Sequence, residues 1–185
     1  MAVAWKRIAR RIRVPLGFAF AVVFFWSARP SPLFLLLSLV LVAPGLLLRG
    51  YASGYVKKNA ELTTTGPYAH TRNPLYLGSM MIAFGFALAA RSLWLAAAMV
   101  ALFAAIYIPV IRAEEEYLRS AFPGFDAWAA TVPRLLPRLV AAGGSGHANG
   151  VFSAALYRTH REYNALLGAA GMYAALILKL ILLRN

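Results

Sequence analysis

The stretch "LYLGSMMIAFGFALAARSLWLAAAMVALFAAIYIPVI" covers residues 75–111 and decides the fold class. Its only charged residue, Arg91, divides it into apolar runs at 75–90 and 92–111. A helix that crosses a bilayer needs about 20 mostly apolar residues, with a range of about 17–25. Two such runs joined by the short turn "ARS" predict an antiparallel pair of transmembrane helices.

Three further apolar runs, at 14–28, 32–48 and 164–183, bring the predicted spans to five. The first run follows a basic segment and could be read as a signal peptide. No convincing small-residue cleavage site follows "FFWSARPSP", so we expect a retained first helix. The sequence predicts an all-α integral membrane protein whose residues 1–185 form a single domain.

The composition agrees with this class, because 61% of the 185 residues are hydrophobic and only 14% are charged. Soluble domains carry about 25% charged and 45–50% apolar residues. The net charge of +13 fits basic residues that flank membrane spans and meet anionic lipid headgroups, so we expect membrane lipids and no nucleic acid as partners. There is no cysteine and the three histidines are scattered, so we expect no metal site.

The distribution of basic residues predicts the orientation in the membrane. With a cytoplasmic N-terminus, 15 of the 19 Lys and Arg residues lie on the cytoplasmic side of the predicted spans. The polar segments 49–74 and 112–163 then share the cytoplasmic face, and only short turns lie on the far side. This one-sided arrangement favours an enzyme that takes a soluble reactant from the cytoplasm. The Ala-, Leu- and Arg-rich composition without cysteine suggests a bacterial inner membrane.

The segment "GPYAHTRNPLYLG" (66–78) places polar groups at the start of the third predicted span. Asn73 followed by Pro74 is typical of a helix N-cap and first helical position, so we expect Asn73 to cap this span. Capping does not explain three other side chains of the segment, which we expect to cluster at one membrane depth: Tyr68, Arg72 and Tyr76.

An acidic run, Glu114–Glu116, follows the fourth predicted span. Consecutive helical residues point about 100° apart, so at most one or two of these carboxylates can face the 66–78 segment. The alternative is a solvated helix end whose acids pair with Arg112 and Arg119. We expect a helix here, a turn at 123–124 and a second helix in "FDAWAATV". Of the remaining acids, Glu61 precedes the 66–78 segment, and we expect Asp126 and Glu162 to be surface residues.

Together, "GPYAHTRNPLYLG" and "RAEEEYLRSAFPGFDAWAATVPRLLP" resemble the two signature elements of the isoprenylcysteine carboxyl methyltransferase and phospholipid methyltransferase superfamily. The resemblance covers roughly residues 50–140. It implies S-adenosyl-L-methionine as the cofactor, held at the cytoplasmic membrane edge without a Rossmann domain. In agreement, the sequence has no strand followed by G-x-G-x-x-G.

The resemblance also implies roles for individual residues. Glu114, and after it Glu115, would bind the cofactor's ammonium or ribose, and tyrosine rings would flank its adenine or sulfonium. Arg72 would pair with the cofactor's carboxylate or hold the loop to the acidic run. Arg112, which could draw in an anionic acceptor, and Asn73 are the candidate catalytic residues. The full candidate cofactor set is Leu62, Thr63, Tyr68, Arg72, Asn73, Pro74, Tyr76, Glu114 and Glu115.

Two departures from the family pattern leave the substrate subclass open. Asn73 stands where the prenylcysteine enzymes usually carry histidine, and "FGFAL" supplies only Gly85 of a Gly-x-Gly element found in the phospholipid enzymes. We expect direct in-line methyl transfer to a lipophilic acceptor that enters from the bilayer, most simply of the isoprenylcysteine carboxyl O-methyltransferase type. The alternatives are a phospholipid N-methyltransferase and, from another class, a non-catalytic membrane protein for binding or assembly.

Overall fold

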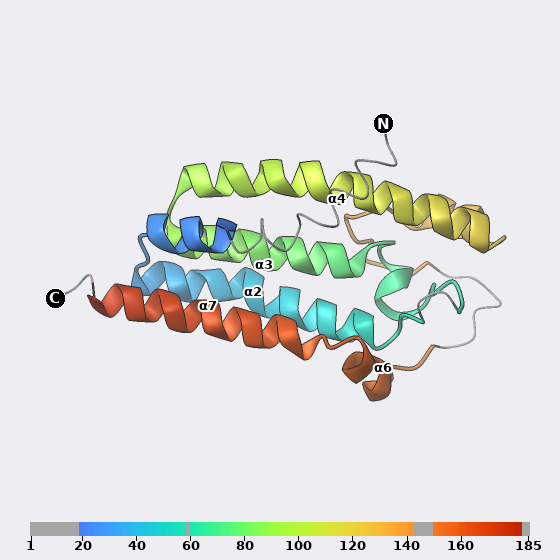
Figure 1. Cartoon of the computed structure of the whole chain (residues 1–185). Helices are drawn as coiled ribbons and strands as arrows, with labels where there is room; N and C mark the ends of the chain where they lie inside the picture. The colour runs from blue at the N-terminus through green and yellow to red at the C-terminus, as the bar shows by residue number, and fades with distance from the viewer. Residues whose placement is uncertain (1–18, 58–59, 143–149, 183–185) are drawn as a thin grey trace.

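The computed structural model of this chain describes residues 19–57, 60–142 and 150–182. Its long helices lie side by side along one direction, and the small elements gather at one end (Figure 1). Every regular element within these ranges is helical, which confirms the predicted class. A helical segment at 19–27 is followed by α2 (Pro32–Ser53), η1 (Gly66–Ala69), α3 (Pro74–Ala90), α4 (Leu93–Ala121), α5 (Phe125–Thr131), α6 (Ala154–Thr159) and α7 (Tyr163–Leu182).

Three helices are long and apolar enough to cross a membrane, namely α2, α4 and α7, and α3 is a shorter apolar helix. These four correspond to the predicted spans 32–48, 75–90, 92–111 and 164–183. The first predicted span, 14–28, begins outside the described residues, and its described part is helical at 19–27.

Helix α4 continues ten residues beyond residue 111, where the predicted span ends, so the helix expected over the acidic run is the continuation of that span. Its end at Ala121 has a local cause, because Pro123 disfavours helical geometry at the preceding Phe122, which is extended with φ −130° and ψ 110°. At 1.5 Å per residue, the 29 residues of α4 measure about 43 Å, against about 30 Å for the hydrocarbon core of a bilayer. The acidic end of α4 therefore projects beyond the apolar layer.

Helices α2 and α3 approach each other closely at two glycines. A Cβ atom added to Gly45 would lie 2.9 Å from the carbonyl oxygen of Gly78, and one added to Gly78 would lie 2.7 Å from that of Gly45. Small residues allow such backbone contact between membrane helices. This contact fixes the first turns of α3, where the polar 66–78 segment enters the helix, against α2.

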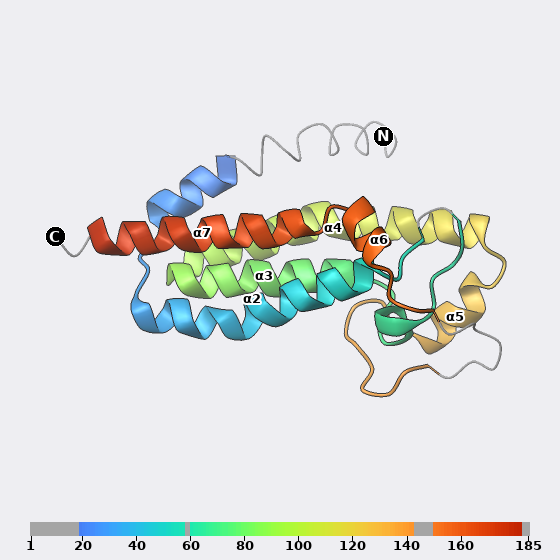
Figure 2. The ribbon, with the colours of Figure 1, turned by 90° about the horizontal axis from the view of Figure 1, so that it is seen from below.

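The apolar interior has two parts. The larger cluster lies among the long helices and includes Phe24, Val42, Phe86, Leu95 and Leu176. The smaller cluster lies where η1 meets α5, at the end of the molecule seen in Figure 2, and consists of Ala52, Tyr68, Phe125, Trp128 and Val132.

Polar contacts attach α7 to α2. The Ser38 Oγ and Tyr173 hydroxyl oxygens are 2.7 Å apart, and the Arg49 guanidinium lies 2.8 Å from the Glu162 carboxylate. The interpretation of Glu162 as a surface acid was therefore wrong. The reason is that α7 folds back onto α2 and brings Glu162 against Arg49, a residue 113 positions away in the sequence.

Candidate functional site

A short strap without regular secondary structure, residues 133–142, holds the 66–73 loop. The strap follows α5, and in every hydrogen bond between the strap and the loop the strap contributes a backbone atom. Three N–H donors make these bonds, each with a donor–acceptor distance of 2.9 Å: Arg72 to the Pro133 oxygen, Arg138 to the His70 oxygen and Ala142 to the Ala69 oxygen. The loop is therefore fixed between the strap and the start of α3.

Asn73 precedes the first residue of α3, Pro74, as predicted, but its side chain does not cap the helix. Its Nδ2 instead donates a hydrogen bond of 2.9 Å to the carbonyl oxygen of Arg134 in the strap. Thr71, which is fully buried, likewise donates from Oγ1 to the oxygen of Leu135 at 3.0 Å. The prediction of a side-chain cap was wrong because the amide that would make the cap is bound to the strap.

Glu115 is the buried acid of the site, with 7% of its side chain exposed. One carboxylate oxygen lies 3.4 Å from Nη1 of Arg72, and the other lies 2.7 Å from Nη2 of Arg134. Burial lowers the pKa of Arg72, an effect that the Glu115 carboxylate opposes, and the hydrogen bond to Glu115 raises the pKa of Arg134. Glu115 thus joins α4, the loop and the strap.

This ion-pair network differs from the pairing considered for a solvated helix end. The partners of Glu115 are Arg72 and Arg134, and Arg119 instead contacts Asp126 at 2.8 Å on the surface. Of the two roles considered for Arg72, attachment of the loop to the acidic run is the one observed.

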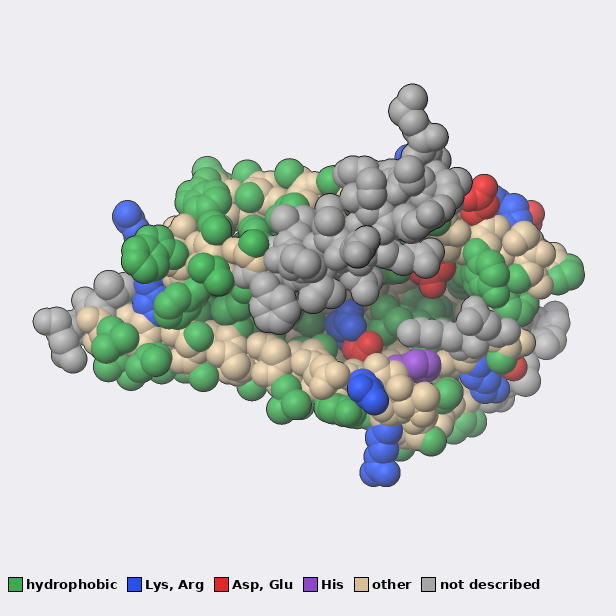
Figure 3. Space-filling model, in the orientation of Figure 1, with side chains coloured by type: hydrophobic (Ala, Val, Ile, Leu, Met, Phe, Trp, Pro, Cys, Tyr) green, Lys and Arg blue, Asp and Glu red, His purple; other side chains and the backbone are tan. Residues whose placement is uncertain are grey.

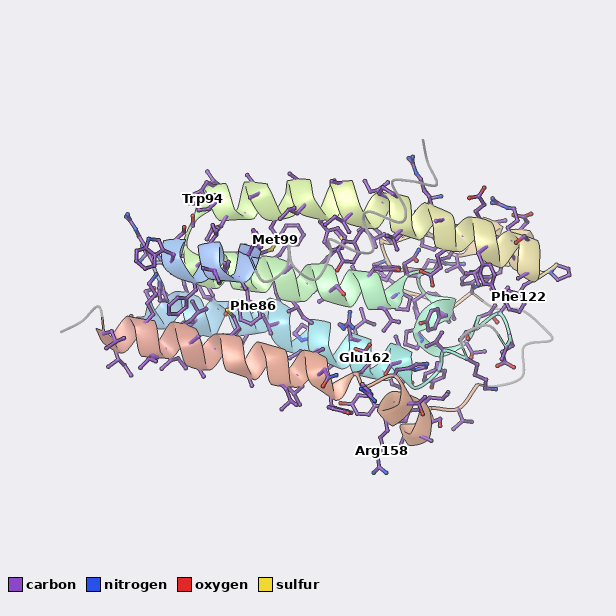
Figure 4. All side chains as sticks on the ribbon, viewed as in Figure 1. Phe86, Trp94, Met99, Phe122, Arg158 and Glu162 are labelled. Atoms are coloured by element: carbon purple, nitrogen blue, oxygen red, sulfur yellow. The ribbon has the colours of Figure 1, made fainter. Side chains whose placement is uncertain are left out.

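A cavity of about 180 Å³ lies between the loop, the end of α4 and α5. Seven of the nine candidate cofactor residues line it: Leu62, Thr63, Tyr68, Arg72, Asn73, Glu114 and Glu115. Pro74 and Tyr76 lie outside the lining, but the Tyr76 hydroxyl donates a 2.8 Å hydrogen bond to the Glu114 carboxylate. The loop and α4, far apart in sequence, are thus brought together around one cavity. Figure 4 shows this end of the molecule, where Phe122 marks the end of α4.

Sequence reasoning did not single out the aromatic wall of the cavity. Phe125 and Trp128 of α5 line it, with ring centroids 5.8 Å apart in an edge-to-face arrangement. The Trp128 Nε1–H group donates to the Tyr68 carbonyl oxygen at 3.3 Å. Burial, and secondarily the negative charge of Glu114, raises the pKa of Tyr68. The spacing of Phe125, Trp128 and Val132, which share one face of a helix, was the available signal.

The remaining candidate, Arg112, is exposed on α4 and is not among the residues that line the cavity. Its catalytic role stays a prediction. The rim of the cavity instead carries the exposed ion pair of Lys57 and Glu61, whose charged atoms are 2.9 Å apart.

A family model described as "Phospholipid methyltransferase" matches residues 33–124, from α2 to the turn that precedes α5. The cobalt-zinc-cadmium resistance protein CzcN of Cupriavidus metallidurans is 35% identical over 134 residues, covering 69% of this chain and 62% of the relative. The nickel-cobalt-cadmium resistance protein NccN of Alcaligenes xylosoxydans xylosoxydans is 42% identical over 89 residues, covering 48% and 41%.

The chain thus spans less than two thirds of the length of each of these relatives. No solved structure matches. The family match covers α3 and α4. The first motif includes the start of α3, the second includes the end of α4, and both motifs contribute residues to one cavity. The family match therefore confirms that the chain resembles the superfamily of membrane methyltransferases to which the phospholipid and the isoprenylcysteine carboxyl methyltransferases belong.

Proposed function

We propose that this chain is an integral membrane methyltransferase that uses S-adenosyl-L-methionine to methylate a lipophilic acceptor. The observation that carries the proposal is the cavity in which the 66–73 loop, the acids of α4 and the aromatic rings of α5 meet. The family match supports the same reaction class. The cofactor would supply the methyl group, and the residues of the chain would hold and orient it.

The cavity offers groups that suit such a cofactor. The Glu114 carboxylate, oriented by the Tyr76 hydroxyl, is matched to the ammonium group. The faces of Tyr68 and Trp128 are suited to a flat or cationic group. Ligand cavities commonly measure about 300–1,000 Å³, so a cavity of about 180 Å³ would enclose only part of the cofactor. We expect the rest to lie across the rim formed by Lys57 and Glu61.

The acceptor would approach from an apolar groove of about 560 Å³ that runs along α2. Leu46, Leu47 and Leu166 line this groove together with the Glu162 carboxylate. Arg49 pairs with Glu162 and also donates to the carbonyl oxygen of Leu75, which lines the cofactor cavity. Arg49 therefore lies between the groove and the cavity, as a group that positions both reactants would.

For the acceptor itself we propose a carboxylate of the isoprenylcysteine type, with an amino-phospholipid as the alternative. A carboxylate needs no general base, whereas an amine must first lose a proton. Membrane extracts supplied with methyl-labelled cofactor distinguish the two. A label released by mild base indicates an ester, and a base-stable label indicates an N-methyl group and overturns the carboxylate assignment.

Calorimetry with S-adenosylhomocysteine tests the cofactor site directly. Loss of a hydrogen bond to a charged group costs about 1.5–3 kcal/mol, so Glu114→Gln should weaken binding at least tenfold. Glu116→Gln is the matched control, because Glu116 is exposed on the same helix and does not line the cavity. Equal affinity in both variants, or no binding by the wild-type protein in detergent and in lipid nanodiscs, would contradict the proposal.

A second candidate function is a non-catalytic role in metal resistance, since both relatives are named as metal resistance proteins. The two candidates differ in their dependence on Glu114. If the chain acts in metal resistance, wild-type protein should rescue cells sensitized to cobalt or cadmium, and a lack of rescue contradicts this second candidate. Rescue that survives Glu114→Gln supports the non-catalytic role, and rescue that is lost with this variant but kept with Glu116→Gln supports the enzyme.

A further inference from the structure

The end of the molecule opposite the cofactor cavity carries a second hollow, which we name the basic groove. It measures about 1,060 Å³ and is formed by residues 25–30, the α3–α4 turn at 91–94, and Lys179 of α7. Figure 4 shows Trp94 at this end, remote from Glu162 and Phe122. Ala28, which lines the groove, is almost fully buried.

Three cations line the basic groove, Arg29, Arg91 and Lys179, and no acid accompanies them. On the face shown in Figure 3, this end has blue side chains without red ones, whereas both colours occur at the other end. The sequence has only six acidic residues, and they are Glu61, Glu114, Glu115, Glu116, Asp126 and Glu162. None of the six lines the groove, and Glu114, the first acid of α4, is 21 residues along the helix from Leu93, or about 30 Å away.

The cations are held in place by the fold. Lys179 Nζ donates to the carbonyl oxygens of Phe25 and Trp26, which end the 19–27 helical segment. Because an ammonium has three donors, one remains to face the groove. The backbone N–H of Arg29 donates to the Ala90 oxygen at 2.9 Å, which ties its segment to the end of α3.

Arg91 ends α3 in the left-handed conformation, with φ 52° and ψ 39°. Glycine is the usual residue at such a position, because a Cβ atom is strained there. The Arg91 guanidinium lies 4.9 Å from the centre of the Phe34 ring, which supports its placement. A strained backbone that carries a long cationic side chain is a reason to look for a ligand of that side chain.

The rim of the basic groove has the side chains of a membrane interface. Trp26 is 84% exposed and Trp94 is 52% exposed. Tryptophan is enriched where hydrocarbon meets the headgroup layer. The separation of about 30 Å from the acidic end of α4 matches the thickness of a bilayer's hydrocarbon core. With α4 across the bilayer, the basic groove would lie at the depth of the lipid phosphates in the leaflet opposite the cofactor cavity.

We propose that the basic groove binds the headgroup of an anionic phospholipid through its phosphate. Arg29 and Arg91 would donate hydrogen bonds to the phosphate oxygens, the free N–H of Lys179 would add a third, and the acyl chains would extend beside the exposed tryptophans. The phosphate would then balance the positive charge of these three described side chains.

Native mass spectrometry and thermal unfolding of the purified full-length protein test this proposal. Phosphatidylglycerol should be retained on the protein and raise its unfolding temperature more than phosphatidylcholine does. The double variant Arg29→Gln, Arg91→Gln should lose affinity for phosphatidylglycerol at least tenfold. The matched control is Arg158→Gln together with Arg161→Gln, which removes the same charge from exposed positions near the opposite end and should leave this affinity unchanged.

The variant Arg91→Gly separates lipid binding from folding, because glycine relieves the backbone strain while it removes the cation. It should unfold at the same or a higher temperature without lipid and still respond less to phosphatidylglycerol. Equal retention of phosphatidylcholine, or unchanged affinity in the double variant, would overturn the proposal. An equal stabilisation by inorganic phosphate would show a site for free anions instead of a lipid and would overturn it as well.

Discussion

The two ends of the molecule use arginine and lysine in opposite ways. At the cofactor end, Arg72 and Arg134 share one buried carboxylate, and Arg49 pairs with Glu162. At the other end, Arg29, Arg91 and Lys179 gather with no acid beside them. Basic residues at the first end are part of the internal structure, whereas those at the second end leave a charge for something outside the chain to balance. Removing a charge should therefore have unequal consequences at the two ends.

The largest effect is expected for Glu115→Gln. Removing one partner of a buried ion pair costs about 3–5 kcal/mol, and the low end of that range applies because Arg134 is half exposed. Two guanidinium groups would then face each other without a carboxylate between them. Unfolding in detergent by heat or by sodium dodecyl sulfate measures the loss. A change below about 1 kcal/mol would mean that the network does not hold the loop.

A smaller loss is expected for Lys179→Met, which keeps the length of the side chain but removes the ammonium. Two carbonyl oxygens at the end of the 19–27 segment would lose a charged donor. Hydrogen bonds to charged groups contribute about 1.5–3 kcal/mol. Because Lys179 is partly exposed, we expect the free energy of unfolding to fall by about 1.5 kcal/mol. The same unfolding assay measures it, and an unchanged midpoint would contradict this structural role.

Arg91→Gly should change stability in the other direction. Left-handed geometry costs a residue with a Cβ atom roughly 1–2 kcal/mol, so relief of this strain should stabilise the protein by about 1 kcal/mol in lipid-free detergent. Arg91→Ala is the matched control, because it removes the charge but keeps the Cβ atom. If both variants are destabilised equally, the cation itself stabilises the fold and the contrast between the two ends fails.

The smallest effect is expected for Asp126→Asn. This acid lies at the cofactor end, but its pair with Arg119 is exposed on both sides. Exposed ion pairs contribute little because water and salt screen them. We expect no measurable shift of the unfolding midpoint. A midpoint shift as large as that of Glu115→Gln would show that the loss of stability depends on where an acid lies in the molecule and not on how deeply it is buried.

The spans and the two motifs could be predicted because their signals are local. Apolar runs of sufficient length specify membrane helices whatever surrounds them. The contribution of Glu114 and Arg72 to one cavity also followed, since the α3–α4 hairpin returns the chain to the same side. The helix expected over the acidic run, with a turn at 123–124, is also observed, but the sequence did not show that it continues the fourth span as one helix, α4.

The remaining features depend on contacts between distant segments. No local pattern indicates that Glu162 meets Arg49, or that Glu115 is more buried than Glu114 one residue earlier. The side chain of Asn73 has both a local partner, the helix, and a distant one, the strap. The rule for helix caps considers only the helix, but in this structure Asn73 donates to the strap.

The strap of residues 133–142 holds the loop almost entirely through its own peptide groups, whose chemistry is the same for nearly every side chain. Its outward residues, such as Leu136 and Leu139, are exposed and make no such contact. The strap can therefore accept many substitutions there, but it cannot readily accept a change of length. Deleting a single residue would shift every carbonyl and N–H group out of register with its partner in the loop. For protein engineering, the strap is a spacer whose length is fixed and whose outward side chains can vary, whereas Arg134 is needed to pair with Glu115.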